Sequence, residues 1–447
     1  MVYLSTLCAS GRYRRPIPLS YVFVFLIEFV RRVGPLLIGT VFYAASAAAE
    51  PLTLEQAWQL AERANPTLLS TQAGLDAAQG ELKDTRAPLW NNPEIFGEVR
   101  DRDSSGAGGA GANNLEGGFG VSQAFETGGQ QRARRAAAQQ NLAATQEDIQ
   151  ETRRQIRAKV ETRFVDVLSL QQRIQSEQET LRLIEQTSQV VKKRVAAGED
   201  SRLEGNLAKV EAERAQNQVS LLSERLTQAR AELAALLQLP AENLPEVTGS
   251  LEPPPSTYTL DNLLERAANR PALRALEFRE NAARSRVQLE RGAVYPNVTL
   301  SLKRDREQEI DSAANIIGLS VNVPLPLFRR NATGIGRAVT ELTQTQIERQ
   351  TANRGASAQV IALWQQLESL RARLTRLEQS VLPSLEENLS LSRKSYEEGE
   401  IGITQLLLVN RQALDARRDV LDARADLRLT KTALEAAAGW TANGSTQ

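Results

Sequence analysis

The sequence predicts a mixed, mainly α-helical fold built from two similar halves, each of which carries two β-strands. A helical stretch opening at Leu52 has a counterpart opening at Tyr258, about 200 residues later. Each is followed by two short alternating segments and then by a long helical stretch that ends at a glycine, Gly198 or Gly399. The composition agrees, because 5% aromatic residues with abundant Ala, Leu, Gln, Glu and Arg is typical of long helices.

This duplication predicts the organisation of the chain. We expect a signal-peptide region at 1–49, a first repeat at 50–250, a second repeat at 251–440 and a flexible tail at 441–447. The elements expected in the first repeat are a helix from Leu54 to Pro88, a β-hairpin at 93–125, a long helix at 129–194 and a helix at 201–238. Those expected in the second are a helix at 260–292, a β-hairpin at 297–325, a long helix at 330–395 and a helix at 402–439.

The N-terminal region has the pattern of a secretory signal. An apolar stretch at 34–43 follows two arginines and leads to small residues, which predict cleavage within Ala47–Glu50. A compact signal of this kind would start at Val30, where we expect translation to begin. The alternative is a membrane anchor, but charges at 28, 31 and 32 interrupt the run of about 20 apolar residues that an anchor needs.

The long helices have the pattern of coiled coils. In the second half, apolar residues alternate between spacings of three and four, the seam of a coiled coil. The seam residues are Val360, Leu363, Leu367, Leu370, Leu374, Leu377 and Val381. Polar residues fill the other positions and predict solvated helix faces, and Pro383 is expected to bend the helix. The helix at 129–194 would be about 100 Å long, and the two shorter helices of its half, stacked end to end, would match it.

The four predicted strands alternate between an apolar face and a face of small or polar residues. The apolar positions are Ile95, Val99, Leu115, Phe119, Val121, Phe125, Val298, Leu300, Leu302, Ile317, Leu319, Val321 and Val323. This is the pattern of strands in a membrane β-barrel, although a soluble hairpin would show it too. The export signal and the glycine-rich loop between the first two strands favour the barrel.

Four strands cannot close a barrel, and open sheet edges are not tolerated in lipid. We therefore expect the chain to oligomerise. Three copies would supply a barrel of about 12 strands, which is within the normal range for bacterial outer membranes. The same three copies would supply enough long helices to form a tube, and a barrel joined to a tube would be a conduit.

Catalytic and cofactor chemistry is poorly supported. The sequence has no histidine, its single cysteine is Cys8 and its single methionine is Met1, so the exported chain has no soft metal ligand. A Ser/His/Asp triad is impossible and no phosphate-binding loop follows the glycines at 106–111. A formal net charge of zero gives no indication of nucleic-acid binding. We expect neither an enzyme nor a bound cofactor.

Two passages resemble a known family. They run from Gly120 to Gly129 (GVSQAFETGG) and from Val321 to Asn331 (VNVPLPLFRRN). Over residues 50–440 the chain is similar to outer membrane factors of the TolC family, and these passages resemble its CzcC-like branch, which serves cobalt, zinc and cadmium efflux. The resemblance implies a homotrimer in outer membrane lipid, with a 12-stranded barrel and a periplasmic α-helical tunnel. It also implies a periplasmic adaptor and an inner membrane resistance-nodulation-division pump as partners.

The helix-to-helix turns are the candidate functional sites. Gly198 and Gly399 fit C-terminal helix caps and Ser201 fits an N-cap. The resemblance implies that these turns form the periplasmic tip that meets the adaptor and closes the tunnel. The residues concerned are Lys193, Arg194, Gly198, Ser201, Lys394, Tyr396 and Gly399. Because Ser395 replaces Arg194 in the second turn, we expect the contact to differ between the two turns.

The same turns are acidic. Glu199, Asp200, Glu397, Glu398 and Glu400 would form a negative ring in a trimer, which favours cation entry; the alternative is ordinary solvated tip residues. The cargo remains open between metal cations, drugs or other small molecules, and a polypeptide of type I secretion. A periplasmic coiled-coil scaffold without a pore is the further alternative.

Overall fold

The computed structural model describes residues 51–104, 112–240, 242–255, 257–309 and 312–439. The expected signal region with its cleavage site and start, the glycine-rich loop at 106–111 and the tail at 441–447 lie outside these residues. The described part of the chain begins at Pro51 and ends at Gly439.

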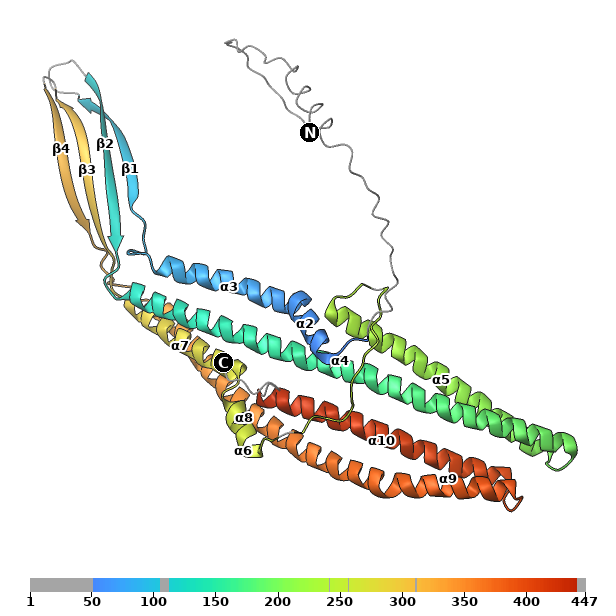
Figure 1. The fold of residues 1–447 in the computed structure, drawn as a ribbon. Coiled ribbons are helices and arrows are strands. Elements are labelled where there is room, and N and C mark those ends of the chain that lie inside the picture. The colour runs from blue at the N-terminus through green and yellow to red at the C-terminus, as the bar shows by residue number, and fades with distance from the viewer. Residues whose placement is uncertain (1–50, 105–111, 241, 256, 310–311, 440–447) are drawn as a thin grey trace, which may run out of the picture. The chain divides into compact units, whose positions relative to one another are not determined.

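The elements follow the same order twice, with two helices, two strands and further long helices in each half (Figure 1). The first half contains α2 (Leu54–Ala64), α3 (Pro66–Thr85), β1 (Glu94–Ser104), β2 (Ala112–Phe125), α4 (Gln130–Ala197) and α5 (Arg202–Leu237). The second contains α6 (Leu260–Ala268), α7 (Pro271–Gly292), β3 (Val298–Glu309), β4 (Ser312–Asn322), α8 (Ala332–Arg376), a π-helical segment (Leu377–Val381), α9 (Leu382–Glu397) and α10 (Ile403–Ala438). The expected mainly helical class is confirmed.

The four strands form one antiparallel sheet in the order β1-β2-β3-β4. Their register aligns Ile95, Val121, Leu302 and Leu319 in a row across the sheet. All four side chains are exposed, Ile95 by 87% and Leu319 by 75%. The alternation in the sequence thus produces one largely apolar face that nothing in the described chain covers.

The helices pack in a row beside one another. The helix α4 contacts α3 on one side and α7 on the other, and α7 in turn contacts α8. The two halves are therefore joined through α4 and α7, as β2 and β3 join them in the sheet. The helix α5 packs on α4, and α10 packs on both α4 and α8.

The prediction of a single helix from Leu54 to Pro88 is wrong in one respect, because the structure has two helices there, α2 and α3. Pro66 has no N–H to donate and restricts Asn65 to extended backbone (φ −68°, ψ 121°), where Asn65 caps α3 by accepting a bond from the Thr67 N–H at 3.0 Å. The Asn65 amide also donates to the Leu236 carbonyl at the end of α5. The residue at the break between α2 and α3 thus also links these helices to α5.

The helices predicted for the second half are also interrupted. The helix expected at 260–292 is broken before Pro271, with Arg270 extended (φ −65°, ψ 153°). The long helix expected at 330–395 continues only to Arg376, where a π-helical turn begins, and the Leu382 N–H bonds to the Leu377 carbonyl. Pro383 follows in the first turn of α9, so the distortion expected from this proline appears as a π segment.

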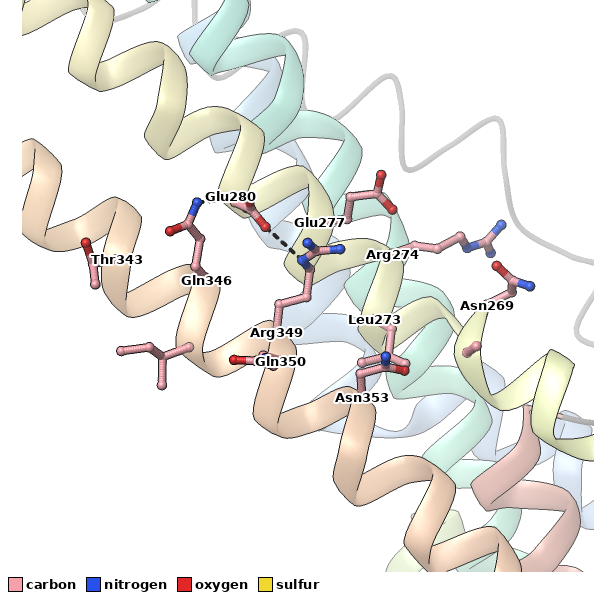
Figure 2. Close-up of a pocket in the computed structure, with 12 residues that line it drawn as sticks. Asn269, Leu273, Arg274, Glu277, Glu280, Thr343, Gln346, Arg349, Gln350 and Asn353 are labelled. Carbon is pink, nitrogen blue, oxygen red and sulfur yellow. Dashed lines mark hydrogen bonds and ion pairs between the residues drawn. The ribbon is translucent and has the colours of Figure 1, made fainter.

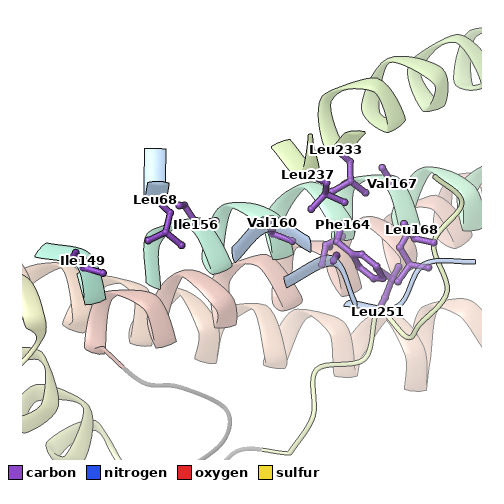
Figure 3. Close-up of a cluster of buried hydrophobic side chains, with 14 residues drawn as sticks. Leu68, Ile149, Ile156, Val160, Phe164, Val167, Leu168, Leu233, Leu237 and Leu251 are labelled. Carbon is purple, nitrogen blue, oxygen red and sulfur yellow. The ribbon is translucent and has the colours of Figure 1, made fainter. Parts of the chain in front are cut away.

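The largest hydrophobic cluster surrounds the middle of α4 (Figure 3). Leu68 of α3, Val160 and Phe164 of α4, and Leu233 and Leu237 of α5 are all buried there. The corresponding cluster of the second half includes Leu263, Val360, Leu367 and Leu434. The predicted coiled-coil seam is present from Val360 to Leu374, whereas Val381 is 39% exposed because it lies in the π-helical segment.

Two junction motifs connect the sheet to the helices. Glu126 forms an ion pair of 2.8 Å with Arg134, and Gly129 begins α4 with a left-handed backbone (φ 75°). Before α8, Asn331 is also left-handed (φ 51°) and its amide donates to the Glu290 carbonyl at 2.9 Å. Glu126, Gly129 and Asn331 belong to the two passages that carry the family resemblance, so these passages form the turns from strand to helix.

Candidate functional site

Both helix-to-helix turns end their first helix with the same left-handed glycine cap. The Gly198 N–H donates to the Val195 carbonyl at 3.1 Å and the Glu199 N–H to the Arg194 carbonyl at 2.9 Å. At the other turn, the Gly399 N–H donates to Tyr396 and the Glu400 N–H to Ser395. With φ of 83° and 78°, the two glycines hold identical Schellman motifs, as the sequence indicated.

The next helices begin differently. Ser201 and Glu204 form a capping box, in which the Ser201 hydroxyl accepts from the Glu204 N–H at 3.2 Å and Glu204 accepts from the Ser201 N–H at 2.8 Å. These bonds lower the pKa of Glu204 below its ordinary value. The helix α10 begins after Gly402 without a side-chain cap. The predicted N-cap at Ser201 is therefore present, and the second turn has no equivalent.

A polar network joins the two turns. The Arg194 guanidinium lies 3.2 Å from an Asp200 carboxylate oxygen and 5.3 Å above the ring of Tyr396. The Tyr396 hydroxyl donates to the other Asp200 oxygen at 3.3 Å. Burial, and next the negative charge of Asp200, raise the pKa of Tyr396. The phenol is therefore protonated at neutral pH and can donate to Asp200.

An apolar cluster lies beneath this network. Val191 of α4, Ala208 of α5, and Tyr396, Ile403 and Leu406 of α9 and α10 are all buried together. The two helical pairs are thus packed against each other at the turns as well as in their middle sections.

The other candidate residues of the turns face solvent. Lys193, Lys394, Glu397, Glu398 and Glu400 are exposed, and no ion pair joins any of them to another described residue. The Glu199 side chain is 62% exposed and lies 3.6 Å from Arg194, whereas the Asp200 side chain is only 10% exposed. In the isolated chain, the acidic character of the turns therefore comes from Glu199 and the three glutamates of the second turn.

Sequence reasoning missed the contact between the turns. Arg194 and Tyr396, which carry it, stand where the other turn has Ser395 and Val195. The sequence therefore showed only that the two turns differ at these positions. That difference indicated that the turns have unequal roles, but it did not show that they contact each other.

The expectation that the helical charges are all solvated is wrong at the contact between α4 and α10. Glu177, whose side chain is 2% exposed, accepts two bonds from Arg418, the longer of them 2.8 Å. Arg173 pairs with Asp422 at 2.9 Å, and these pairs lie on the same side of α4 as Glu161 with Arg428. The pairs form a ladder, because each cation on one helix meets a carboxylate on the other.

The polar face of the sheet is crowded. Glu98 pairs with Arg100 at 2.6 Å, and Lys303 pairs with Asp305 at 2.8 Å. Long side chains lie over glycines of the neighbouring strands: a Cβ on Gly120 would come within 2.5 Å of the Phe96 ring. Carboxylates outnumber cations among the described side chains of this face, with Glu94, Glu98, Glu116, Asp305 and Glu307 against Arg100 and Lys303.

A polar groove of about 550 Å³ lies between α7 and α8 (Figure 2). Its buried carboxylate, Glu280, pairs with Arg349 at 2.7 Å and with Arg284 at 2.9 Å. Because Arg349 of α8 and Arg284 of α7 both pair with it, the Glu280 carboxylate is already occupied in linking the two helices.

Potential metal ligands do not gather in the described part of the chain. Within it, no group of three or more His, Cys, Asp or Glu side chains could hold a metal ion. None of the described helices is both long enough and apolar enough to cross a membrane.

A sheet with one exposed apolar face, joined to a helix of about 100 Å, is the architecture of a subunit of a membrane channel. The family model of outer membrane efflux proteins matches residues 57–238 and 263–440. The chain belongs to this family. It is therefore an outer membrane channel protein with a periplasmic helical part, and it is not an enzyme.

Curated relatives extend the match over most of the chain. The cobalt-zinc-cadmium resistance protein CzcC of Cupriavidus metallidurans is 28% identical over 84% of this chain and 86% of its own. The nickel-cobalt-cadmium resistance protein NccC of Alcaligenes xylosoxydans is 27% identical over 71% of this chain and 72% of its own. The resemblance to the CzcC-like branch of the TolC family is confirmed.

Solved structures share the fold. The outer membrane protein VceC of Vibrio cholerae superposes with a TM-score of 0.73, at 20% identity over 87% of this chain and 96% of its own. CusC, a protein described as forming a transmembrane channel, also superposes with a TM-score of 0.73, at 20% identity over 87% and 92%.

Proposed function

We propose that three copies of this chain form the outer membrane duct of a tripartite efflux system that exports heavy-metal cations. In this assembly the apolar face of the sheet meets lipid and the polar face lines a 12-stranded barrel. A periplasmic adaptor meets the helix-to-helix turns, and an inner membrane pump of the resistance-nodulation-division class drives transport through the helical tunnel.

The observation that carries the metal assignment is the similarity to CzcC, which extends over 84% of the chain. The excess of carboxylates on the polar face of the sheet supports it, because a lumen lined by negative charge favours cations. A duct has no need to bind its cargo tightly, so selection among metals would belong to the pump.

Metal tolerance tests this proposal directly. Deleting the gene in its own host should sensitise cells to cobalt, zinc or cadmium, and expressing the chain from a plasmid should restore tolerance. Unchanged metal tolerance together with a new sensitivity to dyes or drugs would instead support a duct for small organic molecules. Loss of a secreted polypeptide would support type I secretion. The scaffold alternative is excluded by membership of an efflux-channel family.

The proposed trimer has its own test. Native mass measurement of the detergent-purified protein should give three chains, because a four-stranded sheet leaves two unpaired edges in lipid. A stable, folded monomer would contradict the barrel.

A further inference from the structure

Two arginines interrupt the apolar face of the sheet near its hairpin end. Arg304 and Arg306 alternate with Lys303 and Asp305 along β3, so they share the face of Leu302. The register places Arg304 between Phe119 of β2 and Ile317 of β4, and Arg306 between Gly117 and Asn315. Both arginines are exposed.

Neither arginine has a partner among the residues that the structure describes. This distinguishes them from Arg100 and Lys303 on the opposite face, each of which holds a carboxylate at less than 3 Å. The described carboxylate on their own face is Asp101, which stands in β1, two strands away and so about 10 Å distant. No described residue therefore neutralises their positive charge.

The pair lies in the outer half of the lipid-facing band, with Arg306 nearer its edge than Arg304. Arg306 lies eight residues beyond Val298, where β3 begins. At a rise of about 3.4 Å per residue and a strand tilt of about 40°, this is a height of about 21 Å, and Arg304, two residues earlier, lies at about 16 Å. The lipid-facing apolar band of an outer membrane barrel is about 25 Å tall. The hairpin ends point away from the periplasmic helices, so this edge is the outward one (Figure 1).

We propose that Arg304 and Arg306 bind the phosphate groups of lipopolysaccharide, the anionic glycolipid of the outward leaflet. The proposal rests on the barrel of the proposed function, which turns the apolar face toward lipid. A guanidinium group at this height can extend along the barrel wall to the head groups and bind phosphate through two parallel hydrogen bonds. The neighbouring Phe119 and Ile317 would then lie against the acyl chains.

Binding of purified lipopolysaccharide to the intact, detergent-solubilised protein tests the proposal. The double variant Arg304→Gln/Arg306→Gln should bind about tenfold more weakly or worse, because the charge-assisted bonds are lost. The matched control is Arg329→Gln/Arg330→Gln, which removes two exposed arginines at the periplasmic end of the sheet and should bind like the wild type. Lipopolysaccharide stripped of its lipid A phosphates should bind the wild type no better than it binds the double variant.

A conservative variant separates recognition from folding. Arg304→Lys/Arg306→Lys keeps both charges and should retain most of the binding, and channel conductance reports independently whether each variant still forms the duct. Equal binding by the wild type and the glutamine variant would overturn the proposal. So would an equal loss in the control variant, or equal affinity for phosphatidylglycerol vesicles, which would indicate a general anionic-lipid contact. If the glutamine variant conducts poorly but binds lipopolysaccharide as the wild type does, the two arginines do not form the lipopolysaccharide site. That result would also count against the proposed duct geometry, which places them on the lipid-facing side of the barrel.

Discussion

The backbones of Gly128 and Gly292 meet at the junction between sheet and helices. A Cβ added to Gly128 would lie 2.2 Å from the Gly292 carbonyl oxygen, and a Cβ on Gly292 would lie 2.6 Å from that of Gly128. The contact joins the end of β2 in the first half to the end of α7 in the second. No side chain fits between them, so the junction requires glycine at both positions.

Replacing Gly128 by alanine should therefore destabilise the protein by about 1–3 kcal/mol, the usual cost of forcing extra atoms into a packed site. The matched control is Gly355→Ala in α8, where no described residue of the same chain lies within 4 Å of the added Cβ. That change should be neutral or stabilise by up to about 1 kcal/mol. The temperature at which the detergent-purified assembly dissociates on a gel measures both effects. A Gly128→Ala protein as heat-resistant as the wild type would show that the junction can relax.

The network between the turns predicts a change in conductance. Tyr396→Phe removes the hydrogen bond to Asp200, and Asp200→Asn removes the charge that holds Arg194. Both changes should loosen the contact between the turns and raise single-channel conductance in planar bilayers. The conductance increase of the double variant should fall short of the sum of the two single increases, because the residues share one network. Glu242→Gln, which alters an exposed residue in the loop after α5 for which no ion pair is found among the described residues, serves as the control.

The same network predicts a response to alkaline pH. Burial raises the pKa of Tyr396, so its proton is bound more tightly in the folded protein than in the unfolded chain. This contribution to stability is complete below the ordinary tyrosine pKa of about 10 and is lost as pH rises above it. Conductance of the wild type should accordingly rise above about pH 10, with a smaller response in Tyr396→Phe. Identical pH profiles would show that Tyr396 does not control the turns.

The capping glycines predict a partner-docking defect. Gly198→Trp or Gly399→Trp should abolish efflux while the assembly remains intact, because a large side chain would stand where we propose that the adaptor approaches and would strain a left-handed residue. Asparagine adopts this backbone more readily, so Gly198→Asn and Gly399→Asn are the matched controls and should keep efflux. Metal tolerance in cells and trimer formation on gels are the two measurements. Tolerance that survives both tryptophan variants would place the adaptor contact elsewhere.

The exposed glutamates of the second turn predict cation selectivity. In a trimer, Glu397, Glu398 and Glu400 of all three chains would lie at one end of the tube, where their field is screened over about 8–10 Å at physiological salt. Changing all three to glutamine should lower the cation selectivity of single channels, most strongly at low salt. Cellular metal tolerance should fall much less, since the pump drives transport. Selectivity that is unchanged at every salt concentration would leave these residues as a solvated tip.

Local patterns in the sequence predicted much of the fold. The alternation at Val298, Leu300 and Leu302 predicted the apolar face because side chains on a strand alternate with a period of two. Gly198 and Ser201 predicted the end of one helix and the start of the next. The interruptions before Pro66 and Pro271 also have a local signal, because a residue preceding proline avoids the helical region, yet the predicted helices run through both positions.

Contacts between the two halves could not be predicted from local patterns in the sequence. Glu177 looks like any other charge on a long helix, and its burial depends on Arg418, which lies far along the chain. Tyr396 likewise meets Arg194 only after both long hairpins have packed. Such pairs depend on tertiary structure, which a local pattern of charges does not encode.

The helical row and the sheet run in the same order. The first half supplies α3 and β1 at one edge, and the second half supplies α8 and β4 at the other. A copy that pairs its β4 with the β1 of the next copy will, by the same rotation, bring its α8 alongside that copy's α3. A single symmetry operation therefore closes two rings, one of strands joined by backbone hydrogen bonds and one of helices joined by side-chain packing. A register error in either ring is opposed by the other.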